Sequence, residues 1–398
     1  MKPPEPKSRG ALEVDPAHPA EDLTFCPSRG ASVGVELELQ ILDRETGDLA
    51  PGAVRLLQAC REEAIEGVSA ELLQSTIEIK TGVCQSVTEA RDTLKPTLRR
   101  VRNLAASLGY DLTFGGTHPF NRTSTSSVFP AERFQRMEAE MPWLAYQSAV
   151  FGLHVHVGVP DGDLAIGVIN MVVQYLPHLL AMSANSPFWQ GVDTGLASAR
   201  AILFRLTPGS DLPHYFPNWQ GFQDYVEVMR ACEAIVSTKD IYWDIRPRPK
   251  TGTIEFRICD MPATLEYALA LAALIRCLVI ASQRKLEDKP RLRRGDLRRY
   301  WIAVENKWLA SRYGLKAQCI RTPGGRRQPL VRDLGKLLQR LLPIAQETGD
   351  EPFLTALMPL KNFESGADRQ RRLFRDSGDW KAVINDMKER LAQELNRE

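Results

Sequence analysis

The chain has 398 residues, 43% hydrophobic and 25% charged, which is ordinary for a soluble globular protein with ample material for a core. Its 51 basic and 49 acidic side chains nearly cancel, so the composition argues against a general affinity for nucleic acid or for an anionic membrane. The seven cysteines form no CxxC pair and no signal-peptide pattern is visible, so we expect a reduced, cytoplasmic protein.

Two parts of the chain differ in composition. Residues 1–28 are rich in proline and have little apolar periodicity, which predicts a disordered or loosely attached tail. Residues 29–398 are predicted to form one domain, mainly helical in its C-terminal part. We see no internal repeat.

Helical periodicity recurs along the body of the chain. The most regular helix follows the capping-box pattern Ser86-Val87-Thr88-Glu89. The apolar run at 268–282 is too short to span a bilayer and contains Arg276, so it is predicted to be a core helix. A loop is expected at 322–329. Helices are predicted at residues 53–65, 87–108, 131–141, 161–182, 219–236 and 264–285.

Four short stretches alternate apolar and polar residues as β-strands do, but their polar positions carry Glu, His or Arg. Strands with one polar face, alternating with long helices, predict an α+β fold in which helices cover one face of an antiparallel sheet. The four stretches are Val35-Glu36-Leu37-Glu38-Leu39, Ile77-Glu78-Ile79, Leu153-His154-Val155-His156-Val157 and Ile254-Glu255-Phe256-Arg257-Ile258.

If these strands share a sheet, their polar positions gather carboxylates, imidazoles and a guanidinium on one face. Carboxylates so close together would repel one another unless divalent cations lay among them, and hard oxygen ligands favour Mg²⁺ or Mn²⁺ over Zn²⁺. Arg257 then suggests a phosphate nearby. The plain alternative is a sheet with an ordinary solvated face. The predicted metal ligands are Glu36, Glu38, Glu78, His156 and Glu255, with His154 either a ligand or a phosphate contact, and the predicted catalytic residues are Arg257, Glu255 and His154.

The chain has neither a Walker-type glycine loop nor a Gly-x-Ser-x-Gly nucleophile motif. A nucleotide would therefore be bound through metal-bridged phosphates and arginine. Arg200 and Arg246 are candidates for gripping a substrate carboxylate, because a guanidinium can do so with two hydrogen bonds, although a surface salt bridge explains them equally well. Asn185 and Ser186, in the polar loop that precedes Arg200, are further candidates for binding substrate.

These motifs, taken together with others, resemble those of the bacterial carboxylate-amine ligases, also called type 2 glutamate-cysteine ligases. The resemblance covers about residue 30 to the end. It rests on Gly34-Val35-Glu36-Leu37-Glu38, Gln74-Ser75-Thr76-Ile77-Glu78-Ile79, Gly152-Leu153-His154-Val155-His156-Val157-Gly158-Val159, Ser183-Ala184-Asn185-Ser186-Pro187-Phe188-Trp189-Gln190-Gly191, Gly252-Thr253-Ile254-Glu255-Phe256-Arg257, Asp193-Thr194-Gly195, Glu305-Asn306-Lys307-Trp308 and Arg369-Gln370-Arg371.

The resemblance implies a glutamine-synthetase-like catalytic fold, in which an antiparallel sheet curves into a funnel that holds Mg²⁺ and ATP. It implies a reaction in which ATP phosphorylates a substrate carboxylate, and an amine attacks the acyl phosphate to give an amide, ADP and phosphate. This chain departs from the family at Leu37, where a third acid is usual, and at Lys80, where asparagine is usual.

We therefore expect an ATP- and Mg²⁺-dependent ligase with glutamate as acid and cysteine or another amino compound as amine. Its partners are expected to be these small molecules, with no nucleic acid and no membrane, and any self-association is expected to give a homodimer. Two alternatives stay open: a metal-dependent amide hydrolase using His154 and His156, and a non-catalytic sensor of nucleotides or amino acids.

Overall fold

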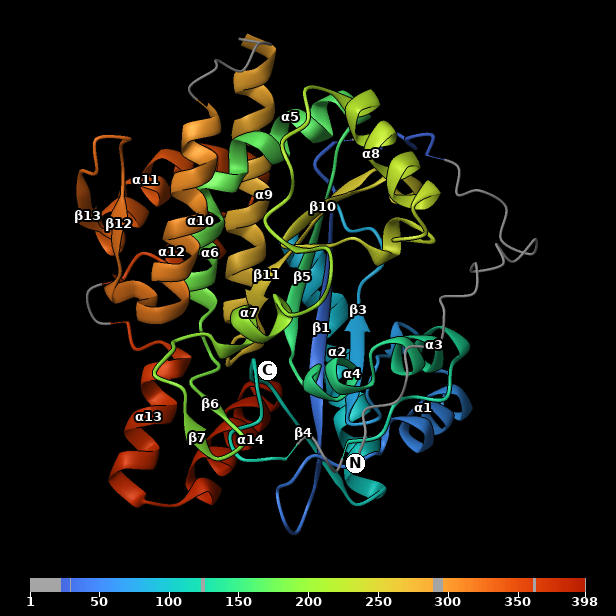
Figure 1. The fold of residues 1–398 in the computed structure, drawn as a ribbon. Helices are drawn as coiled ribbons and strands as arrows, with labels where there is room; N and C mark the ends of the chain where they lie inside the picture. The colour runs from blue at the N-terminus through green and yellow to red at the C-terminus, as the bar shows by residue number, and fades with distance from the viewer. Residues whose placement is uncertain (1–22, 29, 123–125, 289–295, 361–362, 398) are drawn as a thin grey trace, which may run out of the picture.

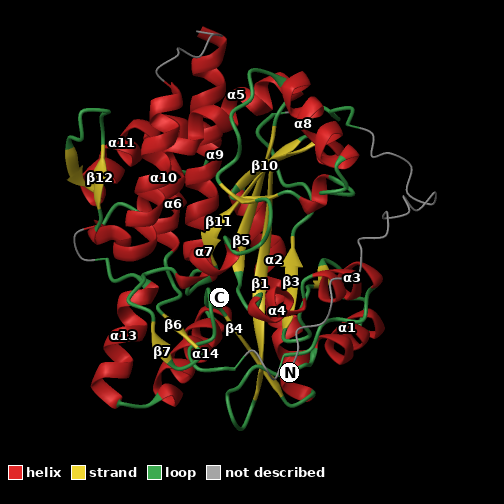
Figure 2. Ribbon diagram, viewed as in Figure 1, coloured by secondary structure: helices red, strands yellow, loops and turns green. Residues whose placement is uncertain are grey.

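The computed structural model describes residues 23–28, 30–122, 126–288, 296–360 and 363–397. Helices surround a central sheet whose strands run side by side through the middle of the molecule (Figure 2). The strands of this sheet are β1 (Val33–Asp43), β2 (Val68–Ala70), β3 (Thr76–Lys80), β4 (Tyr110–Thr113), β5 (Gly152–Gly158), β10 (Ile245–Arg248) and β11 (Thr253–Asp260).

The central sheet is antiparallel throughout, as the sequence predicts. Its strands follow the order β10-β11-β5-β1-β3-β2, and β4 pairs with the end of β1. Strand β1 has 11 residues, long enough to pair with β3 on one side and with β5 and β4 on the other (Figure 1). The four strands that carry the polar motifs, β11, β5, β1 and β3, are therefore consecutive neighbours.

The two faces of the sheet differ in chemistry because side chains alternate along each strand. In β1, Val35, Leu37 and Leu39 are fully buried on one face, and Glu36 and Glu38 lie on the other. Helices α2 (Val87–Ser107) and α9 (Leu265–Asp288) contact the sheet, and their apolar side chains join the same core. The other face is left for polar side chains.

Helix α2 begins where the sequence predicts. The Ser86 hydroxyl accepts a hydrogen bond from the backbone N–H of Glu89, while the Glu89 carboxylate accepts one from Gln85, one residue before the cap. The remaining helices are α1 (Ala53–Glu62), α3 (Glu132–Glu140), α4 (Pro142–Gln147), α5 (Gly162–Val172), α6 (Leu176–Ser183), α7 (Ala199–Phe204), α8 (Trp219–Ala231), α10 (Asp296–Tyr313), α11 (Leu330–Thr348), α12 (Glu351–Ala356), α13 (Gly366–Ser377) and α14 (Trp380–Asn396).

Two predicted elements differ from the structure in kind, and the helix predicted at 219–236 ends earlier, at Ala231. The helix expected at 161–182 is divided into α5 and α6 by a 3-10 turn at Val173–Tyr175, next to Pro177, which has no N–H to donate to a continuous helix. The loop expected at 322–329 is part of a hairpin. The sequence does not reveal the two strands of this hairpin, because strands of three residues are too short to show alternation. The small two-stranded sheets are β6 (Phe188–Trp189) with β7 (Val192–Asp193), β8 (Ser210–Asp211) with β9 (Tyr242–Trp243), and β12 (Gln318–Ile320) with β13 (Arg327–Pro329).

The predicted tail, residues 1–28, lies mostly outside the described residues. Residues 23–28 are described, and the backbone N–H groups of Cys26 and Ser28 donate to the carbonyls of Pro249 and Val159. One apolar core runs from β1 to α14. The division into a tail and one domain stays a prediction.

Two helical stretches, Gly162–Ser183 and Leu265–Asp288, are long and apolar enough to cross a membrane by composition alone. In the fold, 67% and 83% of their apolar windows are buried. Both pack as core helices, which is what the sequence predicts for 268–282.

Candidate active site

The polar face of the sheet centres on Glu36. The strand register places Glu36 opposite His154 on β5 and opposite Lys80 on β3. Along the same face, Glu38 lies opposite Glu78, and His156 lies opposite Glu255. The structure thus brings together all the residues predicted as metal ligands, because four neighbouring strands share one polar face.

Two imidazoles contact the Glu36 carboxylate. Nδ1 of His154 lies 3.3 Å from one carboxylate oxygen, and Nε2 of His156 lies 3.3 Å from the other. Nδ1 of His156 also hydrogen-bonds with the Thr253 hydroxyl at 3.0 Å. In both rings Nε2 is buried and, among the described residues, has no partner in hydrogen-bond geometry. Such atoms are available to a ligand.

Two sets of three side chains bring potential ligand atoms within 4.8 Å of one another. The first set is Glu36, His156 and Glu255, and the second is Glu36, Glu78 and His154. Carboxylate oxygens with an imidazole nitrogen are a donor set that Mg²⁺ or Mn²⁺ accepts. Together with the unpartnered Nε2 atoms, these sets fit divalent cations.

Glu38 belongs to neither set. Its carboxylate accepts a hydrogen bond from the backbone N–H of Gly152 and lies 3.5 Å from Nε2 of His154. It therefore connects β1 to the start of β5 and adds negative charge beside the ligand sets. The role of Glu38 and of the members of both sets as metal ligands stays a prediction.

The surroundings shift the pKa values of the carboxyls in opposite directions. Burial alone would raise the pKa of Glu36, but the close contacts and charges of His154 and His156 hold it below its ordinary value. Burial and the negative charge of Glu36 raise the pKa of Glu78, although Lys80 partly opposes them. A bound cation would relieve the repulsion that Glu78 experiences.

Glu255 is held in a cage of guanidinium groups. Arg246 on β10 donates to both oxygens, Nε to Oε2 at 2.8 Å and Nη2 to Oε1 at 3.1 Å. Nη1 of Arg257 donates to Oε1 at 2.5 Å, and Nε of Arg248 lies 3.5 Å from Oε2. Burial alone would raise the pKa of Glu255, but the three arginines hold it well below its ordinary value. Glu255 stays ionised at neutral pH.

Arg257 has one N–H donor that is not used within the described part of the chain. Its Nε is buried and has no hydrogen-bond partner among the described residues. Its guanidinium carbon lies 5.7 Å from the centre of the Phe204 ring, within range of a cation–π contact. A buried, fixed guanidinium with an unused N–H is suited to an anion such as phosphate.

Lys80 lies among the carboxylates. Its Nζ donates to Oε1 of Glu78 at 3.0 Å and to the Ser69 hydroxyl at 3.1 Å. Burial alone would lower the pKa of Lys80, but Glu78 and Glu36 raise it above its ordinary value. The ammonium is therefore a permanent positive charge at this edge of the cluster.

The four residues predicted to bind substrate have partners within the protein. Arg246 already donates hydrogen bonds to both oxygens of Glu255, as described above. Arg200 is buried, and its guanidinium donates to the backbone carbonyls of Arg257 and Ile258 at 3.1 and 3.4 Å. The backbone N–H of Asn185 and the Ser186 hydroxyl donate to the Asp260 carboxylate at 2.9 and 2.6 Å. These bonds fix the 183–200 loop to the end of β11, and a role in substrate binding stays a prediction for all four.

Glu71 is a member of the polar face that the sequence alone does not identify. It directly follows β2, and the β2–β3 register places Ser69, two residues earlier, opposite Glu78. Burial and the nearby charges of Glu38 and Glu78 raise the pKa of Glu71 well above its ordinary value. The sequence does not predict β2, because a strand of three residues is too short to show alternation. The pairing of β2 with β3, which brings Glu71 to the polar face, could therefore not be anticipated.

Two further histidines have structural partners. Nε2 of His118 bonds the carbonyl of Gly47 at 2.9 Å, and Nδ1 accepts from the backbone N–H of Asn121 at 3.0 Å. His178 pairs with Asp333 at 3.0 Å.

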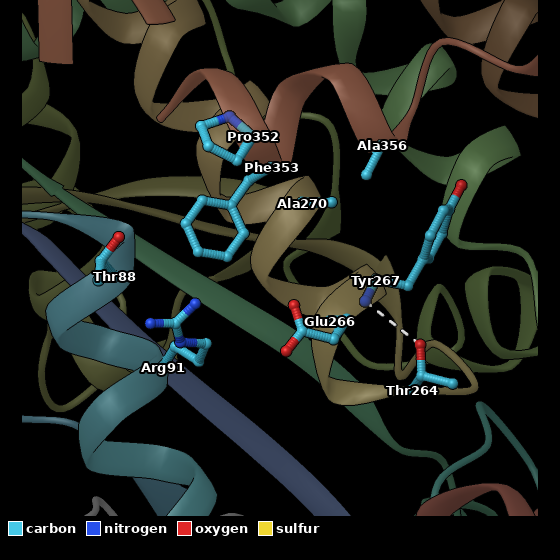
Figure 3. A pocket seen from close by; sticks show the side chains of 9 residues that line it. All are labelled: Thr88, Arg91, Thr264, Glu266, Tyr267, Ala270, Pro352, Phe353 and Ala356. Atoms are coloured by element: carbon cyan, nitrogen blue, oxygen red, sulfur yellow. Dashed lines mark hydrogen bonds between the residues drawn. The ribbon is translucent and has the colours of Figure 1, made fainter. Parts of the chain in front are cut away.

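A pocket of about 340 Å³ lies between α2, α9 and α12, in the helical layer that covers the apolar side of the sheet (Figure 3). Phe353 and Tyr267 line it, with Arg91 and Glu266 at its polar side. Because α2 and α9 pack on the apolar face, the sheet separates this pocket from the Glu36 cluster. The candidate active site is therefore the polar face and not this pocket.

Known structures share this fold. Glutamate–cysteine ligase from Francisella tularensis, solved in complex with AMP, superposes with a TM-score of 0.67 at 12% identity, covering 94% of this chain and 91% of that one. A bifunctional glutathione synthetase from Pasteurella multocida gives a TM-score of 0.70 at 15% identity, covering 92% of this chain and 53% of that one. The glutamine-synthetase-like fold implied by the sequence motifs is confirmed.

Sequence relatives extend over almost the whole chain. One from Gloeobacter violaceus is 39% identical over 372 residues, covering 93% of this chain and 99% of the relative. One from Thermobifida fusca is 38% identical over 368 residues, covering 91% of each. Both carry the name "Putative glutamate--cysteine ligase 2". The family match itself spans residues 32–391, and the chain therefore belongs to glutamate-cysteine ligase family 2.

Proposed function

We propose that the protein is an ATP- and Mg²⁺-dependent carboxylate-amine ligase of the ADP-forming glutamate-cysteine type, with Mn²⁺ able to replace Mg²⁺. The acid is glutamate, activated at its γ-carboxylate, and the amine is cysteine or another amino compound. Membership of the family and the ligase fold support the reaction class. The AMP bound to the Francisella tularensis ligase supports a nucleotide substrate.

The observation that carries this proposal is the division of the polar face into two halves of opposite charge. One half holds Glu36, Glu38, Glu71 and Glu78 with a single ammonium from Lys80. The other half surrounds the single carboxylate of Glu255 with Arg246, Arg248 and Arg257. Metal–nucleotide complexes carry both kinds of charge, so such a face suits cations on one side and phosphate oxygens on the other.

Glu36, Glu78, Glu255, His154 and His156 would hold the divalent cations. Bound there, the cations would offset the charge of the nucleotide phosphates. Arg257, through its unused Nε, would hydrogen-bond oxygens of the transferred phosphoryl group and neutralise charge that develops on them. Glu255 fixes the orientation of that guanidinium, and Arg246 secures Glu255 in turn.

The reaction takes place in two steps. A carboxylate oxygen of the acid attacks the γ-phosphorus of ATP, the bond to the bridging oxygen breaks, and ADP leaves. The amine then attacks the acyl carbon, the bond from that carbon to the phosphate oxygen breaks, and phosphate leaves with the electron pair as the amine loses a proton. The fixed arginines lower both barriers by positioning and charge, not by covalent chemistry.

Measuring ADP release from the purified protein with Mg²⁺, over a panel of amino acids alone and in pairs, tests the proposal. We expect release that depends on ATP and on both an acid and an amine, with glutamate as the best acid. Amide hydrolysis without ATP, by protein that carries zinc, would establish the hydrolase alternative. Tight ATP binding with no ADP release for any pair would establish a sensor.

We also propose a cytoplasmic location and, for any self-association, a homodimer. All seven cysteines are free thiols, five of them buried, which agrees with a reducing compartment.

A further inference from the structure

Lys80 forms a hydrogen bond with a member of only one of the two cation-ligand sets. Its ammonium lies 3.0 Å from Oε1 of Glu78, and the Ser69 hydroxyl donates to the same oxygen at 2.9 Å. Of the two Glu78 oxygens, Oε1 thus already receives two hydrogen bonds. Glu78 belongs only to the set with Glu36 and His154. A divalent cation bound by that set would therefore lie close to an ammonium that is hydrogen-bonded to Glu78, one of the ligands of the cation.

The size of this conflict follows from Coulomb's law. A unit charge and a divalent cation that share one carboxylate repel, at the effective dielectric constant of about 20 that suits protein sites, strongly enough to change an affinity by about tenfold or more. The Lys80 side chain is 42% exposed, so solvent screens part of this repulsion. A large effect on cation affinity is nevertheless expected.

We propose that Lys80 is a built-in cation that partly neutralises Glu78 and so weakens divalent-cation binding in the set of Glu36, Glu78 and His154, while the protein is free of nucleotide. The inference rests on the proposed function, because it concerns the cation sites of the same polar face. It assigns to Lys80 control over how fully the resting protein loads with metal.

Mn²⁺ binding to the full chain, measured without nucleotide by electron paramagnetic resonance of the unbound ion, tests the proposal. Lys80→Met and Lys80→Gln remove the charge, and Gln keeps a hydrogen-bond donor. We expect both to bind Mn²⁺ at least about tenfold more tightly than the native chain. Lys80→Arg keeps the charge and should bind like the native chain. Lys336→Met, an exposed lysine on α11, matches the change in net charge and should also bind like the native chain.

A second variant assigns the effect to its ligand set. Adding Glu78→Gln to Lys80→Met should abolish the gain, because Glu78 is the carboxylate that Lys80 contacts. Unchanged Mn²⁺ affinity in Lys80→Met, or an equal gain in Lys80→Arg, would overturn the inference. Failure of the ligase proposal would be seen separately, as absence of ADP release from a native chain whose Lys80 variants still change Mn²⁺ affinity as expected.

Discussion

At the scale of single residues, the polar face gives one residue type two opposite environments. Glu78 lies beside Glu36 and pairs with Lys80, and burial and the charge of Glu36 together raise its pKa. Glu255 is surrounded by guanidiniums, and its pKa is well below the ordinary value. The first carboxylate is only partly neutralised, by Lys80, whereas the second is paired with three arginines and orients them.

Arg257→Lys tests the role of the unused donor. Lysine keeps the positive charge and one bond to Glu255 but loses the planar fork that leaves Nε free. We expect kcat to fall by about 10²-fold or more, with a smaller change in the KM for the acid. Arg248→Lys is the matched control, since Arg248 lies farther from Glu255, and it should have a smaller effect. A rise in the KM for the acid alone would make Arg257 a clamp for the substrate carboxylate.

Glu255→Gln is nearly isosteric, but it removes the one negative charge among three arginines. We expect activity to fall by at least about 10²-fold and the free energy of unfolding to fall by about 3 kcal/mol. Urea denaturation of Glu255→Gln, Arg246→Met and the double variant would measure the coupling of the pair. The double variant should cost less than the sum of the single changes by about 1 to 3 kcal/mol. Additive costs would show that the cage does not act as a unit.

The side chains that meet on the polar face could be found from sequence because alternation alone fixes which side chains share a face. His154 with His156 and Glu36 with Glu38 are examples. The cage around Glu255 could not be found in this way, because it depends on the pairing of Arg246 on β10 with Glu255 on β11. Glu71 could not be predicted for the same kind of reason, because its place on the polar face depends on the pairing of β2 with β3.

At the scale of elements, β11 has an irregularity next to the residues of the candidate site. Its register with β5 shifts between Phe256 and Cys259, while on its other side the N–H of Arg257 donates to the carbonyl of Asp244, next to β10. The carbonyls of Arg257 and Ile258 are then available to the buried guanidinium of Arg200. A bulge of this kind redirects a side chain next to a site.

Gly152→Ala tests the close approach of Arg200 to β5. A Cβ at Gly152 would lie 2.2 Å from Nη2 of Arg200, so the guanidinium would have to move away from the β11 carbonyls. We expect a loss of about 1 to 3 kcal/mol in the free energy of unfolding, measured by urea denaturation, together with reduced activity. Gly82→Ala is the control, since its Cβ would meet nothing within 4 Å. Equal stability of the two variants would contradict the expectation.

At the scale of the whole molecule, the fold class was predictable because half-polar strands alternate with long amphipathic helices. The short hairpin β12–β13 and the break at Val173–Tyr175 were not, because three-residue elements have too few positions for a period to be visible. The order of the strands likewise depends on contacts between residues far apart in the sequence.

The molecule as a whole should lose stability in mild acid through His118. Burial lowers the pKa of His118 to about 4 in the folded state, whereas the unfolded value is about 6.5. Between these values the unfolded chain binds a proton that the folded chain does not, so stability falls as the pH drops through this window. We expect the native chain to lose roughly 2 to 3 kcal/mol more than His118→Gln between pH of about 7 and about 4.5, by urea denaturation. Equal pH dependence of the two would contradict this assignment.

Glu36 belongs to both cation-ligand sets, and if both sets bind cations, as the proposed function requires, this sharing has a thermodynamic consequence. A cation in either set draws on the same negative charge and repels a cation in the other. The first ion to bind must therefore lower the affinity for the second, and by reciprocity the penalty is the same in either order. The two sets would then form one coupled unit with negative cooperativity, in which a single side chain of β1 makes the binding of each ion weaken the binding of the other.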